Sequence, residues 1–355
     1  MGVIKRQGLK STFVTYFFMA FGIVSNLLIY TKMLEVQELG TIAFVLTTGI
    51  TFAPFVLLGF HVMYLKYFAR FEKEPTDLSR LYSLTLYGPI VLSIILCTSY
   101  LIFRESIVSY YTVNRDVPEI AIDLAILLST IIPFISALTY VCSTLQRTAI
   151  PALLNNSIKV FQPTLVILYF YELLSFNLVL ILVSGFYILL LLVFFFYQQK
   201  QRRIKFIVNP KEILALPETN KMVQFAIYGF AIGAGGMLIT NIDGFMVASL
   251  LGMKDMGLYN WGLTIINAII IPFGMLSNIS SPFISSYWES GNMKELNKLY
   301  KQSANVLLLL CTGLYFAVWL GIDDLFLIIP KGNQYMLAKY AILLIGGAKV
   351  LDAAT

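Results

Sequence analysis

Charged residues are scarce in this 355-residue chain, at 12% of the sequence, whereas hydrophobic residues make up 58%. Soluble domains carry about 25% charged and about 45–50% apolar residues. The composition therefore excludes an ordinary soluble protein and indicates a membrane protein. The net charge is +6, but the basic residues lie in short stretches between apolar runs, which argues against a nucleic-acid partner.

Residues that carry chemistry are few as well. The sequence has one histidine and three cysteines, and Cys97, Cys142 and Cys311 each fall inside an apolar run without metal-ligand spacing. The phosphate-binding pattern G-x-x-x-x-G-K-[ST] is absent, and the longest soluble stretch, 198–221, leaves little room for a catalytic domain. We therefore expect a protein that is not an enzyme and needs no metal or cofactor.

Long apolar runs are what the sequence does contain. A membrane-spanning helix needs about 20 largely apolar residues. By this rule the sequence predicts about ten spans, at 11–31, 40–65, 81–103, 120–143, 150–171, 174–197, 222–250, 257–284, 303–321 and 336–353.

The basic residues predict the orientation. With the N-terminus in the cytoplasm, 18 of the 25 Lys and Arg residues fall on the inner side and six on the outer side, and Lys159 lies within a span. Cytoplasmic loops carry the excess of Lys and Arg. The sequence therefore predicts a multi-pass protein with a cytoplasmic N-terminus and a cytoplasmic basic connector, 198–221.

An internal repeat organises the chain. A shift of 217 places Glu38-Leu39-Gly40 on Asp255-Met256-Gly257, and shifts of 218 and 216 align two further short matches. The first copy holds six helices, so both copies have the same orientation. Parallel repeats of this kind enclose a site between them. The expected fold is an all-α polytopic membrane protein, with N- and C-lobes formed by two parallel six-helix repeats around a central cleft.

The repeat also predicts the lobes. We expect an N-lobe at 1–197, the connector at 198–221 and a partial C-lobe at 222–355, because the second copy stops within its fourth helix on this register. The chain would then be a truncated form of a twelve-helix unit. A natural ten-helix protein with unequal halves is the alternative.

Several short motifs resemble those of a known family, the polysaccharide biosynthesis branch of the multidrug/oligosaccharidyl-lipid/polysaccharide exporter superfamily. They are Gly8-Leu9-Lys10-Ser11, Leu39-Gly40, Gln146-Arg147 with Pro151 and Lys159, Gly257-Leu258-Tyr259, Gly332-Asn333-Gln334-Tyr335 and Lys349-Val350-Leu351-Asp352. The resemblance implies a flippase of O-antigen or capsule precursors in lipopolysaccharide and polysaccharide biosynthesis. Its partners would be an undecaprenyl-type lipid-linked glycan, membrane lipid and other glycan-assembly membrane proteins, in the bacterial cytoplasmic (inner) membrane.

The fifth predicted span carries the first candidate site. Asn155, Lys159 and Gln162 are spaced to share one helix face. An ammonium group suits an anionic pyrophosphate or acidic sugar. The resemblance implies that a basic residue at about this place is part of a cationic lumen, and Arg147 is a further candidate for the substrate path. The alternative is that Lys159 reaches the cytoplasmic interface along its own apolar stem.

Three other polar residues in spans are candidates. Asp243 falls on Asn26 by the shift of 217, so both copies place a polar group at the same depth. Asp243 is a candidate for cation coupling or for pairing with Lys159, and Asn26 for the substrate path. His61 is a candidate proton sensor. The alternatives are packing roles for each of them.

Three functions remain open. The first is translocation of a lipid-linked oligosaccharide by alternating access of the lobes. The second is a cation-coupled multidrug exporter, which would favour a carboxylate-lined lumen without a central lysine. The third, a membrane glycosyltransferase or polymerase, needs a larger outer loop than the one at 104–119.

Overall fold

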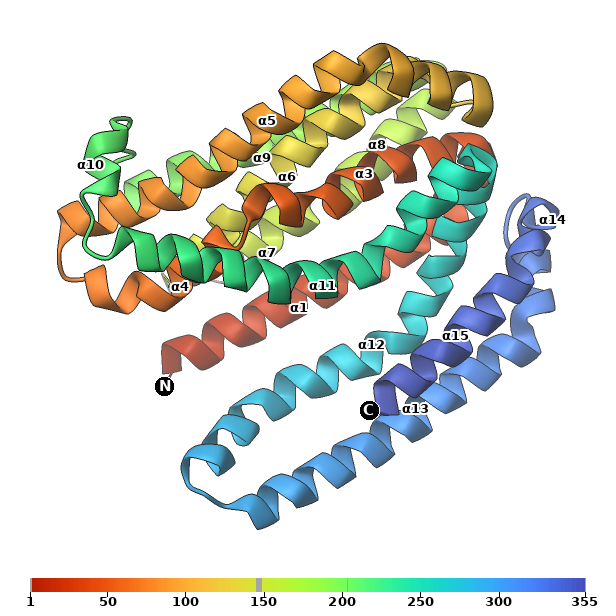
Figure 1. Cartoon of the computed structure of the whole chain (residues 1–355). Helices are drawn as coiled ribbons and strands as arrows, with labels where there is room; N and C mark the ends of the chain where they lie inside the picture. The colour runs from red at the N-terminus through yellow and green to blue at the C-terminus, as the bar shows by residue number, and fades with distance from the viewer. Residues whose placement is uncertain (1, 145–148, 203, 355) are drawn as a thin grey trace. The chain divides into compact units, whose positions relative to one another are not determined.

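The computed structural model describes residues 2–144, 149–202 and 204–354, and no β-strand occurs in these ranges (Figure 1). In chain order the elements are α1 (Gly2–Val24), a π-helix (Ser25–Tyr30), α2 (Thr31–Met33), α3 (Val36–Leu57), α4 (Phe60–Phe71), α5 (Pro75–Arg115), α6 (Glu119–Thr144), α7 (Ala149–Asn156), α8 (Ile158–Phe170), α9 (Phe176–Arg202), α10 (Pro210–Leu214), α11 (Thr219–Leu251), α12 (Met253–Glu289), α13 (Met293–Ile328), α14 (Gly332–Tyr335), a 3₁₀-helix (Met336–Ala338) and α15 (Lys339–Ala354).

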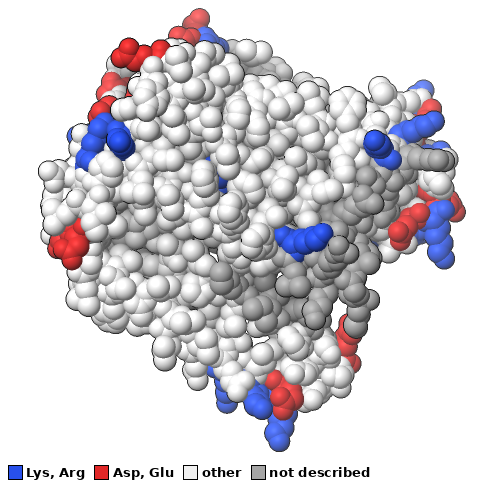
Figure 2. Space-filling view, turned by 180° about the vertical axis from the view of Figure 1, so that it is seen from behind, with Lys and Arg blue, Asp and Glu red and all other residues white. Residues whose placement is uncertain are grey.

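The described helices make this an all-α polytopic membrane protein. Seven are long and apolar enough to cross a membrane, or eight if the two halves of α11 count as one bent span. The face in Figure 2 is mostly uncharged, and most of its charged side chains gather toward the edges. Such a surface suits a hydrocarbon environment, because an uncompensated charge there is costly.

The prediction of ten spans exceeds this count, and the two missing spans have a clear origin. The segment predicted at 150–171 is divided at Ser157 into α7 of 8 residues and α8 of 13 residues. The segment predicted at 336–353 contains α15, which has 16 residues. Both segments are helical, but neither contains a single helix of the length that spans a bilayer.

By contacts the chain forms two compact units. The first contains Met1–Gly22 and Gln37–Met256, and the second contains Ile23–Val36 and Gly257–Thr355. In the first unit α6 packs against α5 and α9, and α4 lies against α5, α6 and α11 (Figure 1). Tyr64, Tyr82 and Phe194 are fully buried there and fill the space between these helices.

The second unit has its own aromatic core. Trp261 is fully buried, with its ring 5.7 Å from that of Phe326 and 4.8 Å from that of Tyr335. Lys331 Nζ lies 2.6 Å from Glu35 Oε1. This ion pair ties the turn before α14 to the segment before α3.

These units do not follow the predicted lobes, since α11 lies in the same unit as α3 to α6 although the repeat assigns it to the second copy. The boundaries 1–197, 198–221 and 222–355 therefore remain a prediction.

The helix boundaries repeat at the predicted shift. The starts of α3 and α12, Val36 and Met253, lie 217 residues apart, and those of α5 and α13, Pro75 and Met293, lie 218 apart. The copies differ at one point. After α3 the first copy turns at Gly59 with φ +73°, whereas α12 continues without a break through the equivalent position, Leu276. A left-handed conformation costs leucine energy that glycine does not pay.

Helix α5 is longer than predicted, with 41 residues in place of the segment 81–103. At about 1.5 Å per residue it is about 60 Å long, twice the ~30 Å of the hydrocarbon core. The part predicted as an outer loop after Arg104 is helical, because no proline or glycine interrupts it before Pro118. The helix ends where Asp116 adopts φ +53° and its N–H donates to the Tyr111 carbonyl.

Candidate functional site

A polar cluster in the first unit contains several of the predicted site residues. Lys159 lies at the start of α8, half-buried, and its ammonium donates to Asn156 Oδ1 at 2.8 Å. Its aliphatic stem passes α1, since a Cβ on Gly22 would stand 3.4 Å from Lys159 Cδ. No described residue forms an ion pair with Lys159. The ammonium therefore retains N–H groups that can donate hydrogen bonds to an anion.

Helix α6 connects this region to α4. Asn155 is exposed at the end of α7 and its Nδ2 donates to Thr139 Oγ1 at 3.1 Å. The next residue of α6, Tyr140, places its ring 4.6 Å from that of His61, at 49°. His61 Nδ1 is buried and has no hydrogen-bond partner among the described residues. The structure thus links Asn155 and His61 through two consecutive residues of α6.

Three residues of this cluster were not predicted: Thr139, Tyr140, and Asn156 as the acceptor for Lys159. Thr139 and Tyr140 are polar side chains near the end of an apolar helix. A polar pair within an apolar run can be recognised in the sequence. Gln162 lies half-buried on α8, one residue before Pro163. Arg147 lies outside the described residues.

Asp243 is placed differently from the prediction that pairs it with Lys159. It is exposed on α11, and its Oδ1 accepts the Gly244 N–H at 2.9 Å. The two side chains, both described, form no ion pair with each other. Asp243 remains a candidate carboxylate for a cation.

Asn26 lies in the second unit, in the π-helix Ser25–Tyr30. Its Oδ1 is buried without a partner in the part of the chain that the structure describes. Short π-helical turns are frequent at functional sites. In the other copy α11 bends by 64° between Thr219–Gly236 and Asn241–Leu251. Both copies therefore depart from straight α-helix near the pair Asn26 and Asp243.

Two charged groups outside this cluster were not foreseen. Arg104 on α5 donates to Asp123 and Glu119 of α6, with distances of 2.7 to 3.1 Å. Arg70 on α4 holds Glu218, the residue before α11, with two hydrogen bonds of 3.1 and 3.2 Å. The hydrogen bonds and charge of Arg70 hold the pKa of Glu218 below its ordinary value, and Glu218 raises the pKa of Arg70.

These groups can bind and orient a ligand, and the described residues include no group of three His, Cys, Asp or Glu arranged for a metal ion. The half-buried ammonium of Lys159 and neighbouring amides suit an anionic or hydroxyl-rich ligand. Asp243 suits a cation.

Comparison with known proteins places the fold. No protein-family model matches the chain, and no curated protein sequence is similar to it. One solved structure has a similar fold, with a TM-score of 0.67 and 13% identity over 98% of this chain and 83% of that chain. It is described as the inward-facing conformation of a multidrug resistance MATE family transporter of the MOP superfamily. The chain has the fold of a MATE transporter. At 13% identity the likeness establishes the fold alone.

Proposed function

We propose that this protein is a membrane transporter that works by alternating access. The observation that carries the proposal is the likeness of 98% of the chain to a solved transporter. Two further features support it: seven or eight helices that are able to span a bilayer, and polar side chains placed on those helices. Polar groups within spans usually face a cavity or a partner.

The first candidate activity is cation-coupled export of small molecules. It is favoured by the similar solved structure, which is described as a multidrug resistance transporter. It is also favoured by Asp243, an exposed carboxylate on the bent helix α11. A carboxylate in this setting attracts a proton or a metal cation and can couple its movement to that of the helix.

The second candidate activity is translocation of an undecaprenyl-type lipid-linked oligosaccharide. It is favoured by Lys159, whose ammonium donates to the neutral amide of Asn156 and forms no ion pair with a described residue. Such a group binds the pyrophosphate of a lipid-linked sugar and repels cationic drugs. In this case the protein would act in the bacterial cytoplasmic membrane beside other membrane proteins of glycan assembly.

Transport by the purified chain in proteoliposomes separates the two. We expect small-molecule export to appear as movement of ethidium driven by an imposed proton or sodium gradient, and Asp243→Asn to abolish it. We expect translocation to appear as protection of a fluorescent lipid-linked oligosaccharide from an external reductant.

Variants of Lys159 sharpen the second assay. Lys159→Gln should slow translocation by at least about tenfold, as expected for loss of a charged hydrogen bond of about 1.5–3 kcal/mol, and Lys159→Arg should retain most of it. Lys298→Gln is the matched control, because Lys298 is exposed and, among the described residues, pairs only with its own helix neighbour Glu295. If neither substrate class moves in these assays, the result would contradict the transporter proposal.

A further inference from the structure

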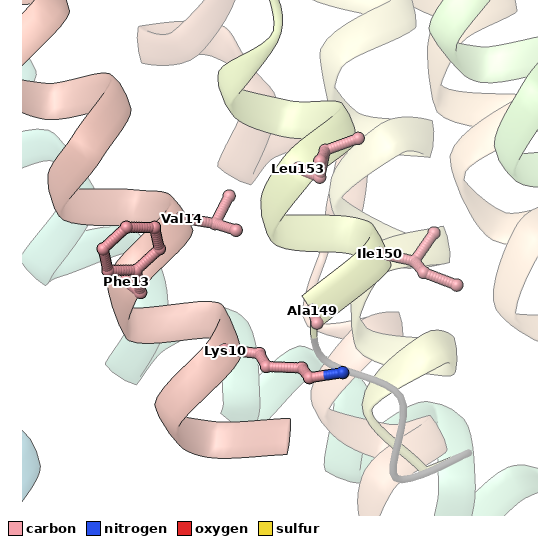
Figure 3. Close-up of a pocket in the computed structure, with 6 residues that line it drawn as sticks. All are labelled: Lys10, Phe13, Val14, Ala149, Ile150 and Leu153. Atoms are coloured by element: carbon pink, nitrogen blue, oxygen red, sulfur yellow. The ribbon is translucent and has the colours of Figure 1, made fainter. Parts of the chain in front are cut away.

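A pocket lies between α1 and α7. Its volume is about 450 Å³, and it is lined by Phe13 and Val14 of α1 and by Ala149, Ile150 and Leu153 of α7, with Lys10 at one end. In Figure 3 the Lys10 side chain extends from α1 toward the start of α7, and Val14 points toward α7. The lining is almost entirely apolar apart from this one ammonium group.

The position of the pocket along the helices fixes its depth. The first predicted span covers 11–31, so we expect Lys10 at the bilayer interface, with Phe13 and Val14 one turn deeper. Only 6% of the most apolar window of that span is buried. One side of the pocket is therefore a helix whose described side chains are mostly only partly buried.

The charge of the site selects its occupant. Lys10 is exposed and forms no ion pair with any described residue. A cation at interface depth above an apolar groove matches a molecule with an anionic head and a hydrocarbon chain, and it repels a cationic amphiphile. At about 450 Å³ the groove is within the ~300–1,000 Å³ typical of ligand pockets.

We propose that the groove between α1 and α7 binds an anionic membrane lipid, with the lipid phosphate on Lys10 and one chain along Phe13, Val14 and Leu153. This proposal does not rest on the proposed transport, since none of the six lining residues belongs to the candidate transport site. It would anchor the loosely packed helix α1 to α7 through a bound lipid.

The test is photo-crosslinking of the full chain in nanodiscs. The probes are phosphatidylglycerol and phosphatidylcholine that carry the same diazirine-bearing acyl chain, and mass spectrometry maps the labelled residues. We expect phosphatidylglycerol to label 13–14 and 149–153 about fivefold more than phosphatidylcholine does, which corresponds to the ~1 kcal/mol of a lysine near an anionic surface.

Two variants make the result decisive. Lys10→Gln should reduce the preference for phosphatidylglycerol to about equal labelling, whereas Lys221→Gln, at a lysine whose side chain is 71% exposed, should leave it unchanged. Ala149→Trp should lower labelling by both lipids, because it fills the groove. Equal labelling by the two lipids in the unsubstituted chain, or a preference that persists in Lys10→Gln, would overturn the proposal and leave only ordinary contact with surrounding lipid.

Discussion

At the scale of single residues, Gly59 shows how one position separates two helices. Its φ of +73° lies in the left-handed region, and a Cβ there would stand 2.0 Å from the Ala226 carbonyl oxygen of α11. The preceding Leu58 also has a positive φ, of 40°. Gly59 therefore separates α3 from α4, and it also lets the backbone of α11 approach closely.

Gly59→Ala should consequently destabilise the protein by at least about 2 kcal/mol, because a left-handed conformation costs alanine about 1–2 kcal/mol and the added methyl group meets backbone atoms. The measurement is the thermal midpoint of the detergent-solubilised protein. Gly185→Ala on α9 is the matched control, since nothing lies within 4 Å of a Cβ there and alanine favours a helix. Equal midpoints for the two variants would show that the close approach of α11 carries no stability.

The residues of the candidate site were predictable in kind but not in their contacts. A lysine within an apolar run predicts a polar role from the sequence alone, and the structure places Lys159 half-buried at the start of α8. Its partner Asn156 and the contact of His61 with Tyr140 depend on which helices pack together. The spacing of residues along one helix does not predict where α6 packs. It is α6 that brings Thr139 and Tyr140 to this region.

At the scale of elements, α11 is held against α4 at its first turn. Arg70 pairs with Glu218 by two hydrogen bonds, and Lys66 Nζ lies 3.7 Å from the centre of the Phe225 ring. Near its other end the Arg115 Nε donates to the Ser249 carbonyl at 2.7 Å and satisfies an acceptor of the last turn. Polar contacts thus fix both ends of a helix whose first half packs on Gly59.

The pair of Arg70 and Glu218 predicts a pH dependence of stability. Because Arg70 lowers the pKa of Glu218 in the folded protein, the contribution of the pair is complete above the ordinary Glu pKa of 4.5. It is lost as the pH falls through the lowered folded-state pKa. We expect a small loss of thermal midpoint in Glu218→Gln at pH 7 that disappears in acid.

The control for that measurement is Glu105→Gln, at an exposed glutamate for which no ion pair is found among the described residues. Its midpoint should differ from that of the unsubstituted chain by the same amount at both pH values. A loss in Glu218→Gln that stays constant from pH 7 into acid would contradict the assignment of the pair.

The sequence predicts the elements well where apolar runs are long and poorly where contacts interrupt them. The starts of α5 and α13 repeat at the predicted shift because polar residues and a turn mark them in both copies. The break at Gly59, the turn at Ser157 and the π-helix Ser25–Tyr30 were not predicted. Each is a local departure from regular α-helix inside an apolar run. Hydropathy is uniform across the run and therefore does not predict the departure.

At the scale of the whole molecule, the distribution of basic residues predicts the orientation, and cysteine accessibility tests it. Cys97, Cys142 and Cys311 are replaced by alanine, and single cysteines are then placed at exposed lysines: Lys211 and Lys298 on the predicted inner side and Lys254 on the predicted outer side. Lys254→Cys should react with a membrane-impermeant maleimide in intact cells. Lys211→Cys and Lys298→Cys should react only after the cells are permeabilised, because 18 basic residues hold their side in the cytoplasm.

The two inner positions matter together, since they lie before α11 and after the start of α13 and belong to different compact units. Between them the chain holds α11 and α12, so an even number of crossings returns it to the same side. If Lys211→Cys and Lys298→Cys react on opposite sides, then α11, bent by 64°, does not cross the membrane as a single span. The parallel arrangement of the two repeats would then fail, because it requires equivalent positions of the two copies to lie on the same side of the membrane.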